Sequence, residues 1–195
     1  MITSKKKPVS PGRWWPLAVL AVLIILAWPS PAEFAEGDAA MDVLSAILAN
    51  GKSSRLHQAL VYGRPVAQDV YAGQWSRRLG SQFVVWATAR AGTDADALEA
   101  ALREALAAAI ERLDEDDVQR AVRAFERTFV TGLESVSDRA AQLNAYLAAP
   151  GDPDYVARDL ARYQGLNAAR VREVAQAVLR PGAGATLRVL PEASR

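Results

Sequence analysis

The sequence predicts an α+β fold in which helices pack on one face of an antiparallel sheet. Two β-rich segments, residues 66–75 and 82–90, flank a short connection that contains Gly80, as is typical of an antiparallel pair. Helical patterns follow from residue 94 to residue 179, and residues 185–190 then have the composition of a closing strand. Strands followed by helices and a final strand indicate the α+β class.

The composition bounds what the chain can do. It has 195 residues, of which 51% are hydrophobic and 23% are charged, and this suits one domain with one sizeable core. There is no cysteine and one histidine. The lack of Cys excludes a disulfide scaffold, a thiol nucleophile and every Cys-based zinc or iron–sulfur site. A single His excludes any site that needs two imidazoles from this chain.

The formal net charge of +1 hides an uneven distribution. Residues 1–13 contain no acid and carry Lys5, Lys6, Lys7 and Arg13. The rest of the chain holds the other 19 of the 23 basic residues and all 22 acidic ones, a balance of −3. Its arginines are interspersed with acids and form no basic stripe with aromatic residues. Nucleic acid is therefore not expected as a partner.

An uncharged apolar run, residues 14–28, follows these basic residues. Together they predict a lead over residues 1–28 that acts as a secretory signal or a membrane anchor, ahead of a folded domain over residues 29–195. The run of 15 residues is shorter than the ~17–25 of a dedicated membrane helix. As an anchor it would contact the membrane and keep the lysines in the cytoplasm. The domain would then face outward, in the periplasm or on the inner membrane.

Two features leave the role of this lead open. Ser30, Pro31 and Ala32 form a small-x-small pattern that is typical of signal cleavage before Glu33. The second part of the run, residues 22–28, is rich in Val, Ile and Leu and also fits a buried β-strand. The lead is therefore a cleaved signal, an anchor or, in its second part, a strand.

The other elements follow from periodicity and from cap residues. Met41, Leu44, Ile47 and Leu48 share one face of a helix that runs from Asp38 to Asn50-Gly51. Polar residues that cap helices precede most of the later helical patterns. The expected segments are a short helix over 54–62 after Ser53-Ser54, a helix from Asp94 to about Leu113, one from Asp114 through Phe125, Phe129 and Leu133, and helices over 137–148, 153–163 and 167–179.

No residue pattern forms a self-sufficient active site. His57 has no acid near it in the sequence, and H-E-x-x-H and H-x-x-E-H are both absent, so a surface or half-buried helical residue is expected. Residues 114–117 are four consecutive acids. Consecutive side chains on a helix point in different directions, so these acids cannot converge on one metal ion. Acids at the start of a helix are stabilised by its dipole, so we expect them to begin a helix. No serine has an evident base partner, and a G-x-S-x-G turn is absent; the serines considered are Ser53, Ser54, Ser135 and Ser137.

The segment Gly51-Lys52-Ser53-Ser54 is similar to the end of a phosphate-binding loop. The full motif needs a glycine five positions earlier, where Ala46 stands, and a preceding strand rather than a helix. We therefore expect a tight turn between two helices, with Arg55 directed into the structure or a groove.

Several blocks of the sequence, taken together, resemble a known family. They are LAWPSPAEFAEGDAAMDVLSAILANGKSSRLHQALVYGRPVAQDVYA, ATARAGTDADALEAAL, DEDDVQRAVRAFERTFVTGLESVSDRAAQL, GDPDYVARDLARYQGLNAARVREVAQAVL and TLRVLPE. In order and spacing they resemble the C-terminal half of insulinase-type (pitrilysin) zinc metallopeptidases. The resemblance covers about residues 26–192, nearly the whole chain.

The resemblance implies paired α+β half-domains that close around a peptide. The N-terminal half carries H-x-x-E-H and a distant Glu on zinc, whereas the C-terminal half lacks the metal and forms the other wall of the chamber. This chain would then be the non-catalytic half or subunit, inactive alone and without a cofactor of its own. Its partners would be a half that holds zinc, or a homologous subunit, and an unfolded peptide. The alternative is a membrane-anchored pseudo-peptidase or scaffold remnant without a catalytic partner.

The resemblance also suggests contact residues. In many relatives the second half lends an Arg and, seven positions on, a Tyr to the substrate; the equivalent positions here are Val61 and Gln68. Arg64 and Tyr71 are close in sequence and could substitute. The candidate contacts for substrate or partner are Lys52, Ser53, Ser54, Arg55, Arg64, Gln68 and Tyr71.

The resemblance also assigns a strand to residues 23–28. Signal cleavage after Ala32 would remove this strand.

Overall fold

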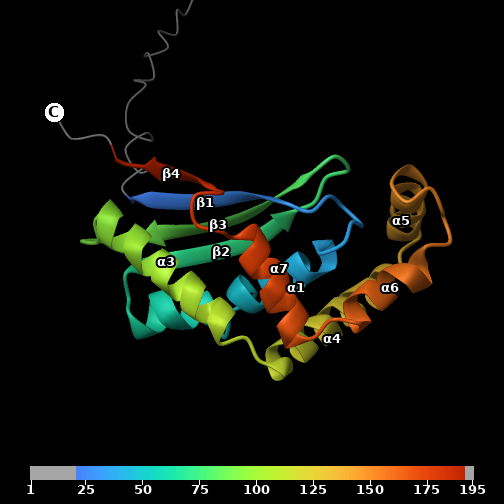
Figure 1. The fold of residues 1–195 in the computed structure, drawn as a ribbon, viewed down its shortest axis with the longest axis horizontal. Helices are drawn as coiled ribbons and strands as arrows, with labels where there is room; N and C mark the ends of the chain where they lie inside the picture. The colour runs from blue at the N-terminus through green and yellow to red at the C-terminus, as the bar shows by residue number, and fades with distance from the viewer. Residues whose placement is uncertain (1–20, 192–195) are drawn as a thin grey trace, which may run out of the picture.

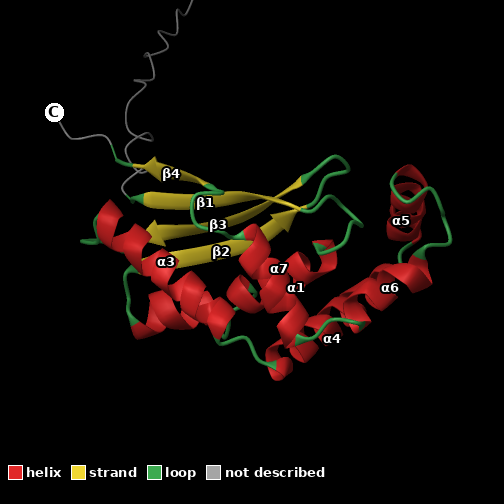
Figure 2. Ribbon diagram, in the orientation of Figure 1, coloured by secondary structure: helices red, strands yellow, loops and turns green. Residues whose placement is uncertain are grey.

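The computed structural model describes residues 21–191 and shows a four-stranded sheet with helices on one face (Figures 1 and 2). The strands lie in the order β2-β3-β1-β4, and each neighbouring pair is antiparallel. Their bounds are β1 Leu23–Ser30, β2 Ala67–Trp75, β3 Ser81–Ala89 and β4 Ala185–Val189. The α+β class, the antiparallel pair and the closing strand are confirmed.

Strand β1 lies inside the sheet, between β3 and β4. Leu23 pairs with Thr88 on one side and with Val189 on the other. Residues 23–28 of the apolar run are therefore strand residues. The boundary expected between the lead, residues 1–28, and the folded domain, residues 29–195, falls inside β1. The earlier part of the expected lead, residues 1–20, lies outside the described residues. Between residues 21 and 191, the helices are too short or too polar for any of them to cross a membrane.

The predicted helices are in place. Their bounds are α1 Asp38–Ala49, α2 Arg55–His57, α3 Ala95–Glu111, α4 Glu115–Gly132, α5 Val136–Ala148, α6 Val156–Gln164 and α7 Ala168–Val178. The short helix expected over 54–62 differs in its second part, because α2 continues as a π-helix, η1 Gln58–Gly63. A Cβ on Gly63 would lie 2.9 Å from the Gln58 carbonyl oxygen, so this wide turn needs a glycine at its end.

Local capping explains where several helices begin. The Asp94 side chain accepts a hydrogen bond from the Ala97 N–H at 2.7 Å, and Asp114 accepts one from Asp117 N–H at 2.8 Å. Each bond satisfies a backbone donor that the first turn of a helix leaves free. Ser135 and Asn167 cap α5 and α7 in the same way.

The core lies between the sheet and helices α1, α3 and α7. The four predicted core residues of α1 are all buried, and they pack with apolar side chains of β1 and β3 such as Leu26 and Phe83. The end of α4 extends beyond the sheet with α5 and α6, as Figure 1 shows. In α5 only Tyr146 is buried. The molecule therefore has a well-packed sheet layer and a helical arm with much exposed surface.

Candidate functional site

The turn before α2 directs Arg55 against the start of α4. Arg55 Nε donates to Asp117 Oδ2 at 2.7 Å, and its Nη2 lies 3.2 Å from Asp114 Oδ2. Asp117 is 8% exposed and also pairs with Arg120. The acidic run is thus a helix cap at Asp114, as predicted, and in addition a buried ion-pair partner at Asp117. Arg55 points into the structure and joins α2 to α4.

Three of the candidate contacts share one hollow. Ser53, Ser54 and Arg55 line a space of about 320 Å³ between α1 and α4. Lys52 is exposed next to them in the chain, and its carbonyl oxygen accepts a hydrogen bond from Gln58 Nε2 at 2.8 Å. This hollow therefore brings together three of the predicted residues.

Ser54 has a base partner that the sequence pattern did not reveal. Its Oγ lies 3.0 Å from Nδ1 of His57, and Nε2 of His57 lies 3.9 Å from Asp69 Oδ1 on β2. Ser54 is only 6% exposed, so its oxygen is poorly placed to attack a substrate. The half-buried His57 instead connects the first turn of α2 with β2, which agrees with the structural role predicted for it.

The other candidate contacts lie around β2. Arg64 follows η1, is exposed, and has Nη1 3.4 Å from Glu104 Oε2 of α3. Gln68 is exposed at an irregularity in β2, between Ala67 and Asp69. Tyr71 lies on the face of the sheet opposite the helices and stacks on Trp86, with ring centroids 3.8 Å apart. The seven residues therefore form two groups, one among the helices and one around β2, rather than a single site.

A cavity that the sequence did not indicate lies between α1, α4, α5 and α6, and acidic side chains and Arg162 line it together with apolar ones. We call it the Asp42 cavity. Its volume is about 440 Å³. Asp38, 3% exposed, accepts hydrogen bonds there from Phe34 N–H at 2.9 Å and from Arg162 Nη2 at 2.7 Å. Arg162 also donates to Asp159 Oδ1 at 2.7 Å. One arginine therefore holds a carboxylate from α1 and a carboxylate from α6.

Asp42 lies in the same cavity without a cationic partner among residues 21–191. Its Oδ2 accepts a hydrogen bond from the Tyr163 hydroxyl at 2.7 Å. The pKa of Asp42 is raised to about 7, and burial is the largest cause. The hydrogen bond from Tyr163 and the charge of Arg162 lower it, while the negative charges of Asp38 and Asp159 add to the rise. The pKa of Tyr163 is raised in turn, first by burial and then by Asp42. Asp42 can thus exchange a proton near neutral pH.

A sequence signal for this cavity existed, although it is weak. Asp38 and Asp42 are four residues apart, so they share a side of α1 that lies close to its apolar face. Acids are rarely buried unless they are paired. The partners, however, lie more than 100 residues further along the chain in α6, and local patterns do not predict such contacts.

The described residues do not fit a zinc ion. Across residues 21–191, His, Cys, Asp and Glu side chains form no group of three or more that could hold a metal. His57 faces a hydroxyl and a single carboxylate, whereas protein zinc sites use three or four protein ligands.

Comparison with known proteins identifies the family to which this fold belongs. The sequence model of the peptidase M16 inactive domain matches residues 21–125, which is 105 of the 195 residues. A search of the curated proteins found no match.

Solved structures agree with this match at the level of the fold. A protease from Helicobacter pylori is 23% identical, with a TM-score of 0.78 over 89% of this chain and 42% of that protein. An inactive peptidase domain, from a protein of Bordetella parapertussis classed as a zinc protease, is 22% identical, with a TM-score of 0.75 over 88% and 93% of the two chains. The periplasmic protease PqqL of Escherichia coli is 16% identical, with a TM-score of 0.68 over 88% of this chain and 19% of PqqL.

These proteins are bacterial, and two of them are much longer than this chain. At such identities they support the fold, and the sequence model covers more than half of the chain. The expected resemblance to the non-catalytic half of insulinase-type peptidases is confirmed. This chain belongs to the peptidase M16 family, as one of its inactive domains.

Proposed function

We propose that this chain is the non-catalytic half or subunit of an insulinase-type zinc metallopeptidase. It supplies one wall of a peptide chamber and docks against a partner half that holds zinc. The observation that carries the proposal is the match of residues 21–125 to the peptidase M16 inactive domain. The single histidine of the sequence supports it, because H-x-x-E-H needs two.

The surface around β2 is the part of the chain that we propose to contact peptide. Arg64 and Gln68 are exposed there, and Tyr71 presents its ring on the open face of the sheet. A guanidinium, an amide and an aromatic ring can bind a peptide backbone and its side chains without sequence preference. The hollow lined by Ser53, Ser54 and Arg55, with Lys52 beside it, is a second contact region.

For the partner half, the exposed side of α5 is the favoured docking surface. Val136, Leu143 and Leu147 are 73%, 49% and 58% exposed. Their spacing of seven and four residues places them on one side of the helix, while Tyr146 lines the Asp42 cavity. An apolar helix face of this kind is typical of a surface that another protein covers.

We place the protein in the periplasm or on the outer side of the inner membrane. PqqL, which shares the fold, is described as periplasmic. The basic residues before residue 14 and the apolar residues 14–22 suit an export signal, whereas anchoring by a membrane helix would also need the residues that form β1. The alternative function is a membrane-anchored scaffold or pseudo-peptidase remnant without a catalytic partner.

The first test is whether a neighbouring reading frame encodes a half with H-x-x-E-H, and the second combines that half with the purified chain. Alone, the chain should bind no zinc stoichiometrically and cleave no peptide. Added to the partner half, it should raise kcat/KM for an unfolded peptide by roughly tenfold or more, as expected if it orients peptide near the zinc. Leu147→Asp should weaken this effect. The equally exposed Leu190→Asp, on the segment after β4, serves as the control.

Two outcomes would contradict the proposal. Cleavage by the isolated chain that a chelator abolishes would show that it carries its own metal site. A partner half that is fully active alone, and is not recovered with this chain in a pull-down, would favour the scaffold alternative.

A further inference from the structure

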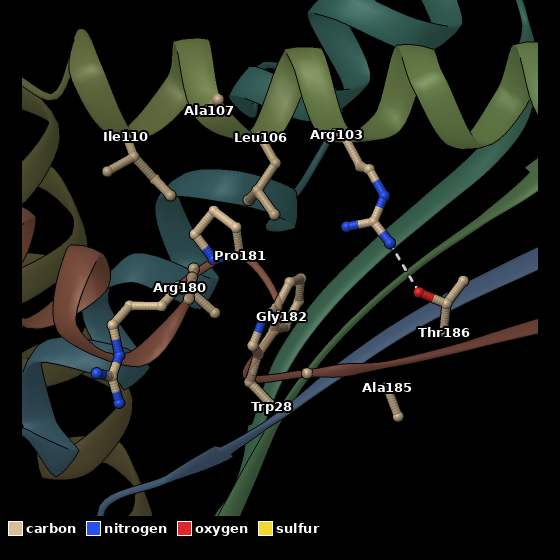
Figure 3. A pocket seen from close by; sticks show the side chains of 12 residues that line it. Trp28, Arg103, Leu106, Ala107, Ile110, Arg180, Pro181, Gly182, Ala185 and Thr186 are labelled. Atoms are coloured by element: carbon tan, nitrogen blue, oxygen red, sulfur yellow. Dashed lines mark hydrogen bonds between the residues drawn. The ribbon is translucent and has the colours of Figure 1, made fainter.

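A separate pocket of about 370 Å³ lies between α3, the end of β1 and the loop that joins α7 to β4. We call it the Trp28 pocket. Its walls are mostly apolar, with Leu106 and Ile110 from α3 and Pro181 from the loop. Figure 3 shows Trp28 and Leu106 projecting toward each other, with Pro181 beside them. A volume of this size falls within the range of ligand sites, about 300–1,000 Å³.

The loop is built to lie close to the indole of Trp28. Gly182 has φ +78°, a conformation that side chains rarely adopt. A Cβ on Gly184 would lie 2.5 Å from Trp28 Nε1 and 2.7 Å from the Ala27 carbonyl oxygen. Glycine at this position therefore lets the backbone form one side of the pocket.

The pocket offers hydrogen-bond donors that lack acceptors. Trp28 is 6% exposed, and its indole N–H makes no hydrogen bond within residues 21–191. In that part of the chain, each fully buried side-chain nitrogen or oxygen has a partner. The indole nitrogen therefore keeps some accessible surface, and an N–H without an acceptor among these residues favours a ligand that accepts a hydrogen bond.

Arg103 supplies a charged donor at one end of the pocket. Its Nε donates to Glu99 at 2.8 Å and its Nη2 donates to Thr186 Oγ1 at 2.7 Å, the bond drawn in Figure 3. Nη1 has no partner in the described part of the chain, and no acid lines the pocket. Glu99 is shared with Arg188, so it offsets only part of the positive charge.

These properties select the chemistry of a ligand. Apolar walls accept an aliphatic or aromatic group, and the remaining N–H groups of a guanidinium can donate charge-assisted hydrogen bonds to a carboxylate. We propose that the Trp28 pocket binds a carboxylate that carries a short apolar group, with Arg103 on the carboxylate and Trp28 and Leu106 on the apolar part. Such a ligand is the C-terminal residue of a peptide or a short fatty acid. The proposal does not depend on a partner half.

The experiment titrates three probes into the full chain: N-acetyl-L-leucine, its amide, and hexanoate. Binding is followed by calorimetry and by the indole N–H resonance of Trp28. The two carboxylates should bind and shift this resonance, and the amide should bind at least about tenfold more weakly. Tighter binding of N-acetyl-leucine than of hexanoate would identify a peptide terminus as the source, and the reverse a fatty acid.

Two variants test the placement of the ligand. Arg103→Gln should weaken binding of the carboxylates by about tenfold or more, whereas Arg112→Gln, beyond the pocket at the end of α3, should not. Ala107→Phe leaves the ion pairs intact and fills the pocket, so it should abolish binding. It keeps the test decisive if Arg103→Gln fails to fold.

The proposal is overturned if the acid and the amide bind equally, or if neither carboxylate binds at about 10 mM. It is also overturned if binding survives unchanged in folded Arg103→Gln or Ala107→Phe.

Discussion

At the scale of single residues, Asp42 shows how placement changes the chemistry of a common side chain. An ordinary aspartate is ionised at neutral pH. Asp42 is held in a partly closed cavity, bonded to the Tyr163 hydroxyl and close to two other carboxylates, and its pKa rises to about 7. The dominant cause is burial, which disfavours the charged form.

The sign of the pH effect follows from this shift. Between pH about 4 and 7 the folded protein holds a proton on Asp42 that the unfolded chain releases, so stability falls as the pH rises through this range. A shift from 3.8 to about 7 corresponds to a loss on the order of 4 kcal/mol above pH 7.

Asp42→Asn should therefore stabilise the protein at pH 8, because the amide can still accept the Tyr163 bond and carries no charge to bury. The gain should shrink as the pH falls through 7 toward 4. Thermal unfolding across this range measures it, with the exposed Asp154→Asn as the control. A gain that does not change with pH would contradict the assignment.

Gly184 is the second residue whose role follows from its surroundings. A Cβ there would clash with the Ala27 carbonyl oxygen as well as with Trp28. The backbone of a paired strand cannot shift without a loss of folding free energy. Gly184→Ala should cost about 1–3 kcal/mol of unfolding free energy. Gly132→Ala is the matched control, because nothing lies within 4 Å of its Cβ and it ends helix α4. If Gly184→Ala and Gly132→Ala changed the free energy of unfolding in urea equally, the close approach of Gly184 to Trp28 and Ala27 would not be required.

At the scale of elements, α2 depends on tertiary contacts. With η1 it spans only residues 55–63, and isolated helices of this length are marginal in water. The Arg55–Asp117 pair, with side chains 25% and 10% exposed, fixes it to the start of α4. The ion pair therefore has a structural role, because it joins two segments that lie 62 residues apart in the sequence.

Arg55→Met should destabilise the chain by about 1–3 kcal/mol, because it leaves the Asp117 charge in a poorly solvated place. The double variant Arg55→Met with Asp117→Asn should lose less than the sum of the single variants. Arg64→Met removes a pair whose side chains are 63% and 76% exposed, and should change stability by less than about 1 kcal/mol. Similar losses for Arg55→Met and Arg64→Met would contradict this account.

At the scale of the whole molecule, strand β1 ties the two ends of the described chain together. It pairs with β3 on one side and with β4, about 160 residues further on, on the other. Its side chains Ile24, Leu26 and Trp28 are buried against the helices. Removal of β1 would leave β4 without a neighbour and open the core.

A chain that starts at Glu33 should therefore lose cooperative unfolding, whereas a chain that starts at residue 21 should keep it. Circular dichroism during heating distinguishes the two. Signal cleavage after Ala32 would yield the first of these chains. A native-like melting curve for the chain from Glu33 would show that β1 is dispensable and would restore that cleavage site.

The sequence by itself determined the elements whose signals are local. The apolar face of α1 and the caps Asp94 and Asp114 mark helices, since periodicity and capping act within a few residues. The ordered blocks over residues 26–192 indicated the family. For the site, the sequence suggested residues near η1 and β2, but not that they form two groups, one among the helices and one around β2.

The tertiary structure alone decided the rest, because the deciding contacts join distant segments. An apolar run such as residues 22–28 suits a membrane or a sheet equally well, and only pairing with β3 and β4 makes it a strand. The pKa of Asp42 depends on residues of α6, and the pocket beside Trp28 depends on the loop before β4. Burial and charge are properties of the assembled fold, so no local pattern contains them.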